Sequence, residues 1–416
     1  MTSVLFKNVN IFDGSGADPY PGTVRVEGQR IVSVTRGLQP VSEDDARVID
    51  GHGAMLMPGL IEAHAHLSFA SSTGRIIKER NLPAEEHLLI TAHNAAVLLD
   101  SGYTSAYSAG SKGARFEVAL KKEIDGGYLP GPRLVPSTFE RAADADKTRS
   151  GPEALAQFIA NAAADGVKSV KLLLSGDDAF GKGGSLDVHY SDVEVGAAAA
   201  AAREHGVWLA AHAQAPEAVK MAARHGFRVI YHCTHADEEA LDMLEARRDE
   251  IFTAPAIGII YAKAYLGEAF GFTREVVQNS GFLEAIERNV AVYAQMRKRG
   301  IRVLPGGDYG FPWNPIGENA RDLELFVRLF SWPTKDVLVA VTRWGAELMG
   351  MGEQLGQIRE GFLADLILVD GNPVEDIAIL QNREKLLAIM KDGAFRKEPA
   401  DGGVLRRERV AATQRA

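Results

Sequence analysis

The chain has 416 residues, of which 46% are hydrophobic and 24% charged, a balance that is typical of a folded globular protein and argues against disorder. Its 46 basic and 55 acidic side chains give a net charge of −9, which disfavours a nucleic-acid partner. No apolar run reaches the roughly 18 residues of a membrane span, and the single cysteine, Cys233, excludes an internal disulfide.

The first 57 residues predict short β-strands without a helix. Turn-forming pairs such as Asp13-Gly14 separate four runs of strand character. The predicted strands are Val4–Val9, Thr23–Val26, Ile31–Val34 and Arg47–Asp50. Four short strands bury little apolar surface alone, so we expect a partner sheet from another part of the chain. Met1–Asn8 lacks the basic and apolar segments of a secretion signal, which together with the single cysteine predicts a cytoplasmic protein without a membrane partner.

From Leu60 onward, strands alternate with helices. The predicted strands are Leu60–His66, Thr104–Ser108, Arg133–Pro136, Ser169–Leu174, Val207–His212, Arg228–His232, Ile251–Ala254 and Ile301–Pro305. The predicted helices are Ala84–Leu99, Pro152–Ala164, Asp192–Glu204, Pro216–Arg224, Glu238–Arg247 and Gly281–Lys298. Eight such units over about 250 residues match a (β/α)8 barrel. The alternative is an open doubly wound sheet, but no glycine-rich phosphate-binding motif follows any strand. We therefore predict an α/β fold with a TIM-like barrel.

The pattern returns to β-strands near the C-terminus. A helix predicted at Val337–Met349 is followed by strands predicted at Leu366–Val369 and Leu387–Lys391. These two strands are the expected partners of the N-terminal ones. Residues 399–416 are polar and rather basic, and we predict that they form a weakly ordered tail.

Two histidines end the first predicted barrel strand. The run Pro58–Leu67 is mostly apolar and contains His64 and His66, which are one residue apart. Side chains alternate between the two faces of a strand, so both imidazoles point to the same side. Paired histidines also occur on solvated surfaces, so this spacing alone is a weak indication of a metal site.

Four further polar residues lie in or after other predicted strands. His212 ends the fifth strand, His232 ends the sixth, and Asp308 follows the eighth. Lys171 lies inside the apolar fourth strand, where an unpaired ammonium is costly. Singly, each histidine has an ordinary reading as a core residue, and Asp308 as a turn residue. Because the carboxyl ends of barrel strands share one mouth, their coincidence instead favours a nitrogen and oxygen ligand set of the kind that zinc accepts.

These residues make the chain resemble the amidohydrolase superfamily, in the subtype with two metals bridged by a carboxylated lysine. Within it, the sequence is most similar to prolidase-like and imidazolonepropionase-related members. The matching stretches are Pro58–His66, Val170–Ser175, Ala210–His212, Tyr231–His232, Gly306–Asp308 and Leu355–Leu366. The resemblance covers nearly the whole chain. It implies a barrel over residues 58–350 and a small β-sandwich built from residues 1–57 and 351–398.

The resemblance also implies a binuclear metal centre. One metal would be held by His64, His66 and Asp308, the other by His212 and His232, and Lys171, carboxylated by carbon dioxide, would bridge both. We expect two divalent ions, zinc first and manganese or cobalt as alternatives. A metal-bridged hydroxide would attack a substrate carbonyl, with Asp308 as general base and then general acid. Tyr190, after the fourth strand, would hydrogen-bond the carbonyl or the tetrahedral oxyanion.

The expected substrate is a small-molecule amide: peptide-like, an N-acyl amino acid or an aryl amide. Deamination is disfavoured, because Ala215 stands where deaminase-like relatives have a glutamate. Dipeptidase activity stays open, because Tyr107–Gly110 lacks the charged pair that dipeptide-cleaving relatives carry and His232 is followed by Cys233. Hydrolysis of an ester, carbamate, urea or lactam, or a non-catalytic scaffold, are the alternatives. We expect a homo-oligomer.

Other residues near the predicted mouth have two readings each. Tyr309, Phe311 and Trp313 follow the eighth strand, where they either contact a flat or aromatic substrate group or pack the top of the barrel. Arg115 and Lys263 are either partners of a substrate carboxylate or solvated surface charges. The sequence does not separate these readings.

Overall fold

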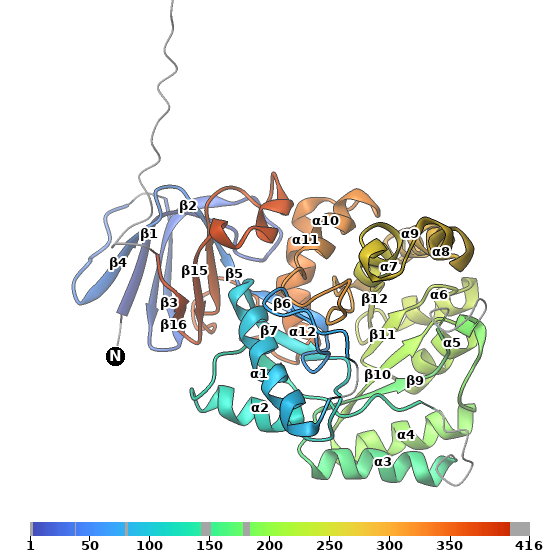
Figure 1. Ribbon diagram of the computed structural model, residues 1–416. Coiled ribbons are helices and arrows are strands. Elements are labelled where there is room, and N and C mark those ends of the chain that lie inside the picture. Colours follow the sequence, from blue (N-terminus) through green and yellow to red (C-terminus); the bar gives the residue numbers. More distant parts are fainter. Residues whose placement is uncertain (1–2, 38, 80–81, 143–150, 178–183, 400–416) are drawn as a thin grey trace, which may run out of the picture.

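The structure is a computed structural model that describes residues 3–37, 39–79, 82–142, 151–177 and 184–399. Figure 1 shows a sheet formed by the two ends of the chain, beside a larger part in which strands alternate with helices. The predicted tail lies outside the described residues, except for Pro399. None of the described helices is both long and apolar enough to cross a membrane.

Strands from both ends of the chain pair in one sheet of eight strands. Its order is β16-β15-β14-β5-β1-β2-β3, and β4 pairs with β1. The bounds are β1 (Ser3–Ile11), β2 (Tyr20–Glu27), β3 (Arg30–Arg36), β4 (Ala46–Asp50), β5 (Met55–Pro58), β14 (Leu366–Val369), β15 (Leu386–Lys391) and β16 (Ala394–Lys397). The two ends join where β5 runs antiparallel to β14, with Leu56 opposite Leu368. The expected partnership between the two ends is therefore present, whereas the two-layered sandwich stays a prediction.

The strand β5 was not predicted as a separate element. All four of its side chains, Met55 to Pro58, are buried. A strand that is buried on both faces has no alternation of apolar and polar residues, which is the signal that reveals a strand in a sequence. The strand β16 was missed as well.

Eight parallel strands follow in chain order. Their bounds are β6 (Leu60–Ala65), β7 (Tyr103–Ser108), β8 (Arg133–Val135), β9 (Ser169–Leu173), β10 (Trp208–Ala213), β11 (Val229–His232), β12 (Phe252–Ala254) and β13 (Arg302–Val303). Strands β6–β8 form one sheet and β9–β13 another. Beyond β8 the backbone joins β9, because the Leu173 amide donates to the Arg141 carbonyl at 2.9 Å. Each strand overlaps a predicted one. Since no pairing of β13 with β6 is recorded for the described residues, the closed barrel stays a prediction.

Helices connect most of these strands. Their bounds are α1 (Ala84–Asp100), α2 (Phe116–Asp125), α3 (Pro152–Ala164), α4 (Asp192–His205), α5 (Pro216–His225), α6 (Glu238–Ala246), α7 (Ile257–Tyr265), α8 (Arg274–Ser280), α9 (Phe282–Lys298), α10 (Arg321–Arg328), α11 (Thr334–Val339) and α12 (Gly345–Leu348). Short 3₁₀ helices are η3 (Gly184–Leu186), η4 (Glu268–Phe270), η6 (Ile377–Gln381) and η7 (Arg383–Lys385), and η5 (Ala340–Trp344) is a π-helical turn. The prediction missed α2, α7, α8 and α10, and its helix at Val337–Met349 spans parts of α11, η5 and α12.

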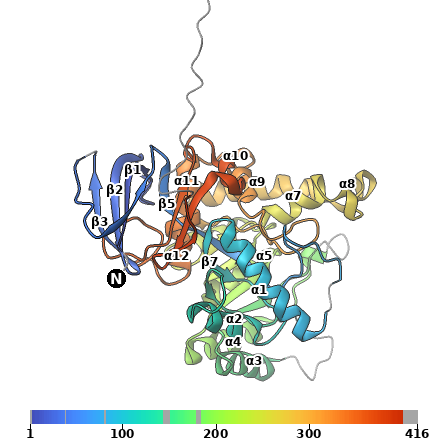
Figure 2. The ribbon, with the colours of Figure 1, turned by 60° about the vertical axis from the view of Figure 1, so that its left-hand side comes forward.

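Capping interactions explain where α4 begins and ends. The Ser191 hydroxyl accepts a hydrogen bond from the Glu194 amide, and the Glu194 carboxylate accepts one from the Ser191 amide, which makes a capping box at the start of α4. Gly206 ends the helix at a φ of 65°, a conformation that glycine adopts without strain. Figure 2 shows α3 and α4 on the side of the molecule away from the terminal sheet, with α7–α9 grouped together.

Candidate metal centre

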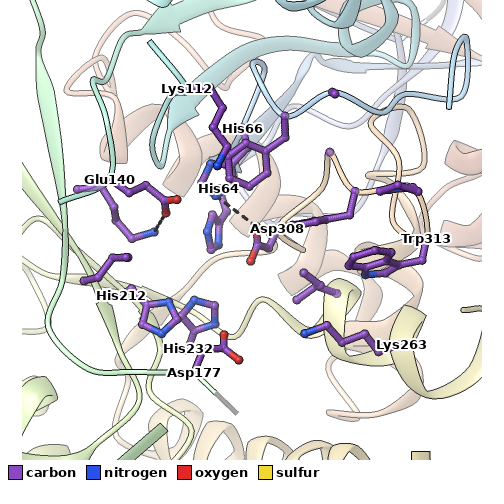
Figure 3. Close-up of a pocket in the computed structure, with 18 of the residues that line it drawn as sticks. His64, His66, Lys112, Glu140, Asp177, His212, His232, Lys263, Asp308 and Trp313 are labelled. Atoms are coloured by element: carbon purple, nitrogen blue, oxygen red, sulfur yellow. Dashed lines mark ion pairs between the residues drawn. The ribbon is translucent and has the colours of Figure 1, made fainter. Parts of the chain in front are cut away.

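The six predicted ligands line one cavity of about 460 Å³. These residues are His64, His66, Lys171, His212, His232 and Asp308. Four of them lie on strands β6, β9, β10 and β11, His66 directly follows β6, and Asp308 lies five residues beyond the end of β13. Figure 3 shows the four histidines and Asp308 around a common space. The structure therefore brings together residues that are up to 244 positions apart (from His64 to Asp308).

His66 and Asp308 face each other as two acceptors. His66 Nδ1 lies 3.0 Å from the Gly110 carbonyl, which can only accept, so Nδ1 carries the proton and Nε2 offers a lone pair. Nε2 lies 3.2 Å from Asp308 Oδ1. Two ligands of one tetrahedral zinc ion, each bonded at about 2.0–2.1 Å, lie about 3.3 Å apart. Ligand atoms of His64, His66 and Asp308 all lie within 4.8 Å of one another, so this group fits a metal ion.

The part of the chain that the structure describes offers no hydrogen-bond partner to the His64 imidazole. Both ring nitrogens are buried without a partner among the described residues, while the ring stacks on Tyr231 at a centroid distance of 3.9 Å. Burial, and then the charge of Lys171, lower the pKa of His64 well below its ordinary value, so the ring is neutral. A buried polar group left unpaired costs about 1–3 kcal/mol. A neutral imidazole with two free nitrogens is a suitable metal ligand.

His212 and His232 form a second pair, with ring centroids 4.2 Å apart. His212 Nε2 donates to the Gly176 carbonyl at 3.1 Å, which leaves Nδ1 available. Burial lowers the pKa of both rings, so that both favour the neutral form. His232 has a φ of 74° and Asp308 a φ of 58°. Such left-handed backbone is strained for residues other than glycine and is frequent at functional sites.

Lys171 is 1% exposed and lines the same cavity. Its ammonium donates to the Ala109 carbonyl at 3.3 Å, lies 3.7 Å from Glu140 Oε1 and is 4.4 Å from the centre of the Tyr231 ring. Burial lowers the pKa of the Lys171 ammonium. Sequence reasoning missed Glu140, which follows β8 and reaches Lys171 only through the fold (Figure 3).

Two buried carboxylates accept hydrogen bonds from groups in or next to the predicted ligands. Glu62 accepts hydrogen bonds from the His64 amide at 2.9 Å and from the Asn319 side chain at 2.7 Å, and burial raises its pKa to about 7. Asp322 accepts a hydrogen bond from the Tyr309 hydroxyl at 2.9 Å, and burial raises its pKa to about 6. Sequence reasoning missed both acids. Glu62 was detectable, because it shares a strand face with His64 two residues later.

Three residues considered at the sequence level do not line the cavity. The Tyr190 hydroxyl donates to the Arg141 carbonyl at 3.0 Å, so contact with an oxyanion would require it to leave this acceptor. Tyr309 packs behind the site against Asp322. Arg115 is exposed and pairs with Asp165 at 3.3 Å.

Phenylalanine and tryptophan side chains form another part of the cavity wall. Phe311 and Trp313 line the cavity, as one of the two readings expected, and Phe69, Phe272 and Phe282 join them. His189 also lines it, and its Nδ1 donates to the Leu173 carbonyl at 3.1 Å. Lys263 lines the cavity from α7. The cavity thus places the six predicted ligands beside a group of aromatic side chains and a buried lysine.

Proteins of known name resemble this chain over much of its length. A family model described as "Amidohydrolase family" matches residues 55–395. Ochratoxinase from Aspergillus niger is 26% identical over 204 residues, which cover 49% of this chain and 40% of the relative. The chain thus matches less than half of that relative's length. Imidazolonepropionase from Aeromonas salmonicida is 23% identical over 379 residues, which cover 83% of this chain and 84% of the relative.

Solved structures share the fold. A Xaa-Pro dipeptidase with methionine bound in its active site superimposes with a TM-score of 0.82 at 24% identity, covering 95% of this chain and 100% of that chain. At this level of identity the likeness shows the fold alone. It supports the TIM-barrel-type arrangement of mixed α/β content that the sequence predicts.

Proposed function

This chain belongs to the amidohydrolase family, and we propose that it is a metal-dependent hydrolase that cleaves an amide bond of a small molecule. The observation that carries the proposal is the convergence of four imidazoles, the Asp308 carboxylate and Lys171 on one cavity. Imidazole nitrogens and carboxylate oxygens are ligands that zinc accepts. The names of the relatives, ochratoxinase and imidazolonepropionase, agree with a hydrolytic enzyme.

We assign the ligands as the family resemblance implies. His64, His66 and Asp308 would hold one divalent ion and His212 and His232 the other, and Lys171, once carboxylated, would supply an oxygen ligand. Zinc is the first candidate, with manganese or cobalt as alternatives. When bound, the metals supply Lewis acidity and lower the pKa of a water molecule.

The residues of the chain supply orientation and proton transfer. Hydrogen bonds to the Gly110 and Gly176 carbonyls fix which nitrogen of His66 and of His212 faces the site. As a ligand of a divalent ion, the Asp308 carboxyl would be ionised. We assign this ionised carboxylate the proton of the attacking water, which it passes to the leaving nitrogen.

From the sequence and the family resemblance we also infer a closed barrel, a two-layered sandwich, domain limits at residues 58 and 350, a homo-oligomer and a cytoplasmic location. Ester, carbamate, urea and lactam bonds are further candidates for the same centre. A non-catalytic scaffold is the alternative to an enzyme.

Metal content tests the proposal. The chain is purified with bicarbonate and without chelator, and its metal is counted beside Lys171→Ala. We expect close to two metals in the wild type and a clear loss in the variant. Lys112→Ala is the matched control, because Lys112 lines the same cavity without belonging to the ligand set. One metal that Lys171→Ala does not change would refute the bridged centre. No metal, and no amide hydrolysis after adding metal, would favour the scaffold.

A further inference from the structure

Lys263 is a buried cation that points into the cavity and has no anionic partner among the described residues. It lies on α7 and is 8% exposed. Among the described residues no carboxylate forms an ion pair or hydrogen bond with its ammonium, which lies 5.3 Å from the centre of the Phe282 ring. Figure 3 shows the side chain extending toward Asp308 and His232 from the side opposite Glu140.

The other lysines of the cavity are in different situations. Lys78 and Lys112 are exposed to water. Lys171 is buried, but it has Glu140 3.7 Å away and the Ala109 carbonyl at 3.3 Å. An ammonium taken out of water without a counter-ion is costly, and an anion bound beside it removes that cost. Lys263 is thus the buried lysine of the cavity whose ammonium has no anionic partner among the described residues.

A continuous row of aromatic rings leads from the predicted ligands to Lys263. Phe69 stacks on His66 at 4.1 Å. The following centroid distances are 5.1 Å from Phe69 to Phe311, 5.3 Å from Phe311 to Trp313, 5.0 Å from Trp313 to Phe272 and 5.9 Å from Phe272 to Phe282. The row ends at Phe282, beneath the Lys263 ammonium. The row of rings thus connects the predicted ligand His66 with the Lys263 ammonium.

We propose that Lys263 binds the carboxylate of an aromatic amide substrate, whose ring lies on the wall of Phe311, Trp313 and Phe272. The proposal rests on the amide-hydrolase function, and it narrows the substrate class to N-acyl aromatic amino acids and related acids. Charge-assisted hydrogen bonds from the ammonium hold the acid, while the scissile carbonyl lies at the ligand residues. Burial chiefly lowers the pKa of His232, and the charge of Lys263 adds to that effect, which agrees with a cation close to the ligands.

Binding to metal-free protein tests Lys263 without turnover. After chelator treatment the metals cannot attract an acid, so 3-phenylpropionate and the uncharged 3-phenyl-1-propanol are titrated by calorimetry. We expect the wild type to prefer the acid by about tenfold or more. In Lys263→Met the preference disappears while the alcohol binds as before. Lys112→Met, the exposed control, keeps it. A variant that binds the alcohol and still prefers the acid overturns the proposal, and Lys263→Gln decides if the methionine variant does not fold.

Hydrolysis by metal-loaded protein provides a second readout. N-acetyl-L-phenylalanine is compared with N-acetylphenethylamine, which lacks the carboxylate. Lys263→Met is expected to lower kcat/KM for N-acetyl-L-phenylalanine about tenfold, mainly by raising KM. It should leave kcat/KM for N-acetylphenethylamine unchanged. If the loaded wild type hydrolyses no amide, the proposed function fails, whereas the binding experiment still decides the role of Lys263. Equal effects on both substrates would show a structural role only.

Discussion

Replacing His64 by leucine separates metal binding from folding. In the metal-free protein the leucine removes two buried ring nitrogens that have no partner among the described residues. Relief of an unsatisfied buried group gains about 1–3 kcal/mol, and the lost stacking on Tyr231 costs about 0.5–1.5 kcal/mol. We therefore expect the stability of the metal-free variant to lie between about 0.5 kcal/mol below and about 2.5 kcal/mol above that of the metal-free wild type.

The metal-loaded proteins should differ in the opposite direction. Metal present at about 1,000 times its dissociation constant stabilises the wild type by about 4 kcal/mol per site. An unfolding entropy of about 2.1 cal/mol/K per residue amounts to about 0.9 kcal/mol/K for 416 residues. One occupied site thus raises the melting temperature by about 5 °C. In His64→Leu this rise should be lost.

Thermal unfolding with and without chelator measures both effects. His87→Leu is the matched control, because His87 is also a buried histidine of the cavity but is not a predicted ligand. It should keep the full rise on adding metal. The reasoning is refuted if His64→Leu keeps that rise, or if the metal-free variant melts several degrees below the metal-free wild type.

Two other substitutions test the proton transfer and the buried tyrosine. Asp308→Asn should lower turnover by about 10²–10⁴-fold and leave the melting temperature of the metal-free protein unchanged, so wild-type rates in this variant would contradict the role of Asp308. Burial raises the pKa of Tyr107 to about 12 in the folded protein, so the stability it contributes is full below its unfolded pKa of about 10 and is lost as the pH rises through 12. Tyr107→Phe should be less stable than the wild type at pH 8, because Ser169 loses its acceptor at 2.8 Å, and should recover about 1.4 kcal/mol relative to it by pH 11. Denaturant unfolding of both proteins at pH 8 and pH 11 checks this. If their free energies of unfolding differ by the same amount at both pH values, the fold does not raise the pKa of Tyr107, and the reasoning is wrong.

Local sequence was informative where short-range chemistry decides the structure. Alternation along a strand places His64 and His66 on one face, and each of the eight predicted barrel strands has a counterpart in β6–β13. The six ligand positions could be proposed because each lies at or near the end of an apolar strand, and parallel strands present those ends together. The helices that were missed include α7, which carries Lys263 and whose apolar residues continue beyond one face.

Tertiary structure decided what no local pattern contains. Arg115 and Lys263 were equal candidates in the sequence, yet one pairs with Asp165 at the surface and the other is buried in the cavity. Glu140 meets Lys171 from a different strand end, and Tyr190 donates to a backbone carbonyl that lies 49 positions away. The periodicity of a segment determines which of its own side chains share a face. Which segments meet depends on long-range packing of the whole chain. The sequence alone therefore predicted the six ligand positions, and only the fold showed which other charged and aromatic groups line the same cavity.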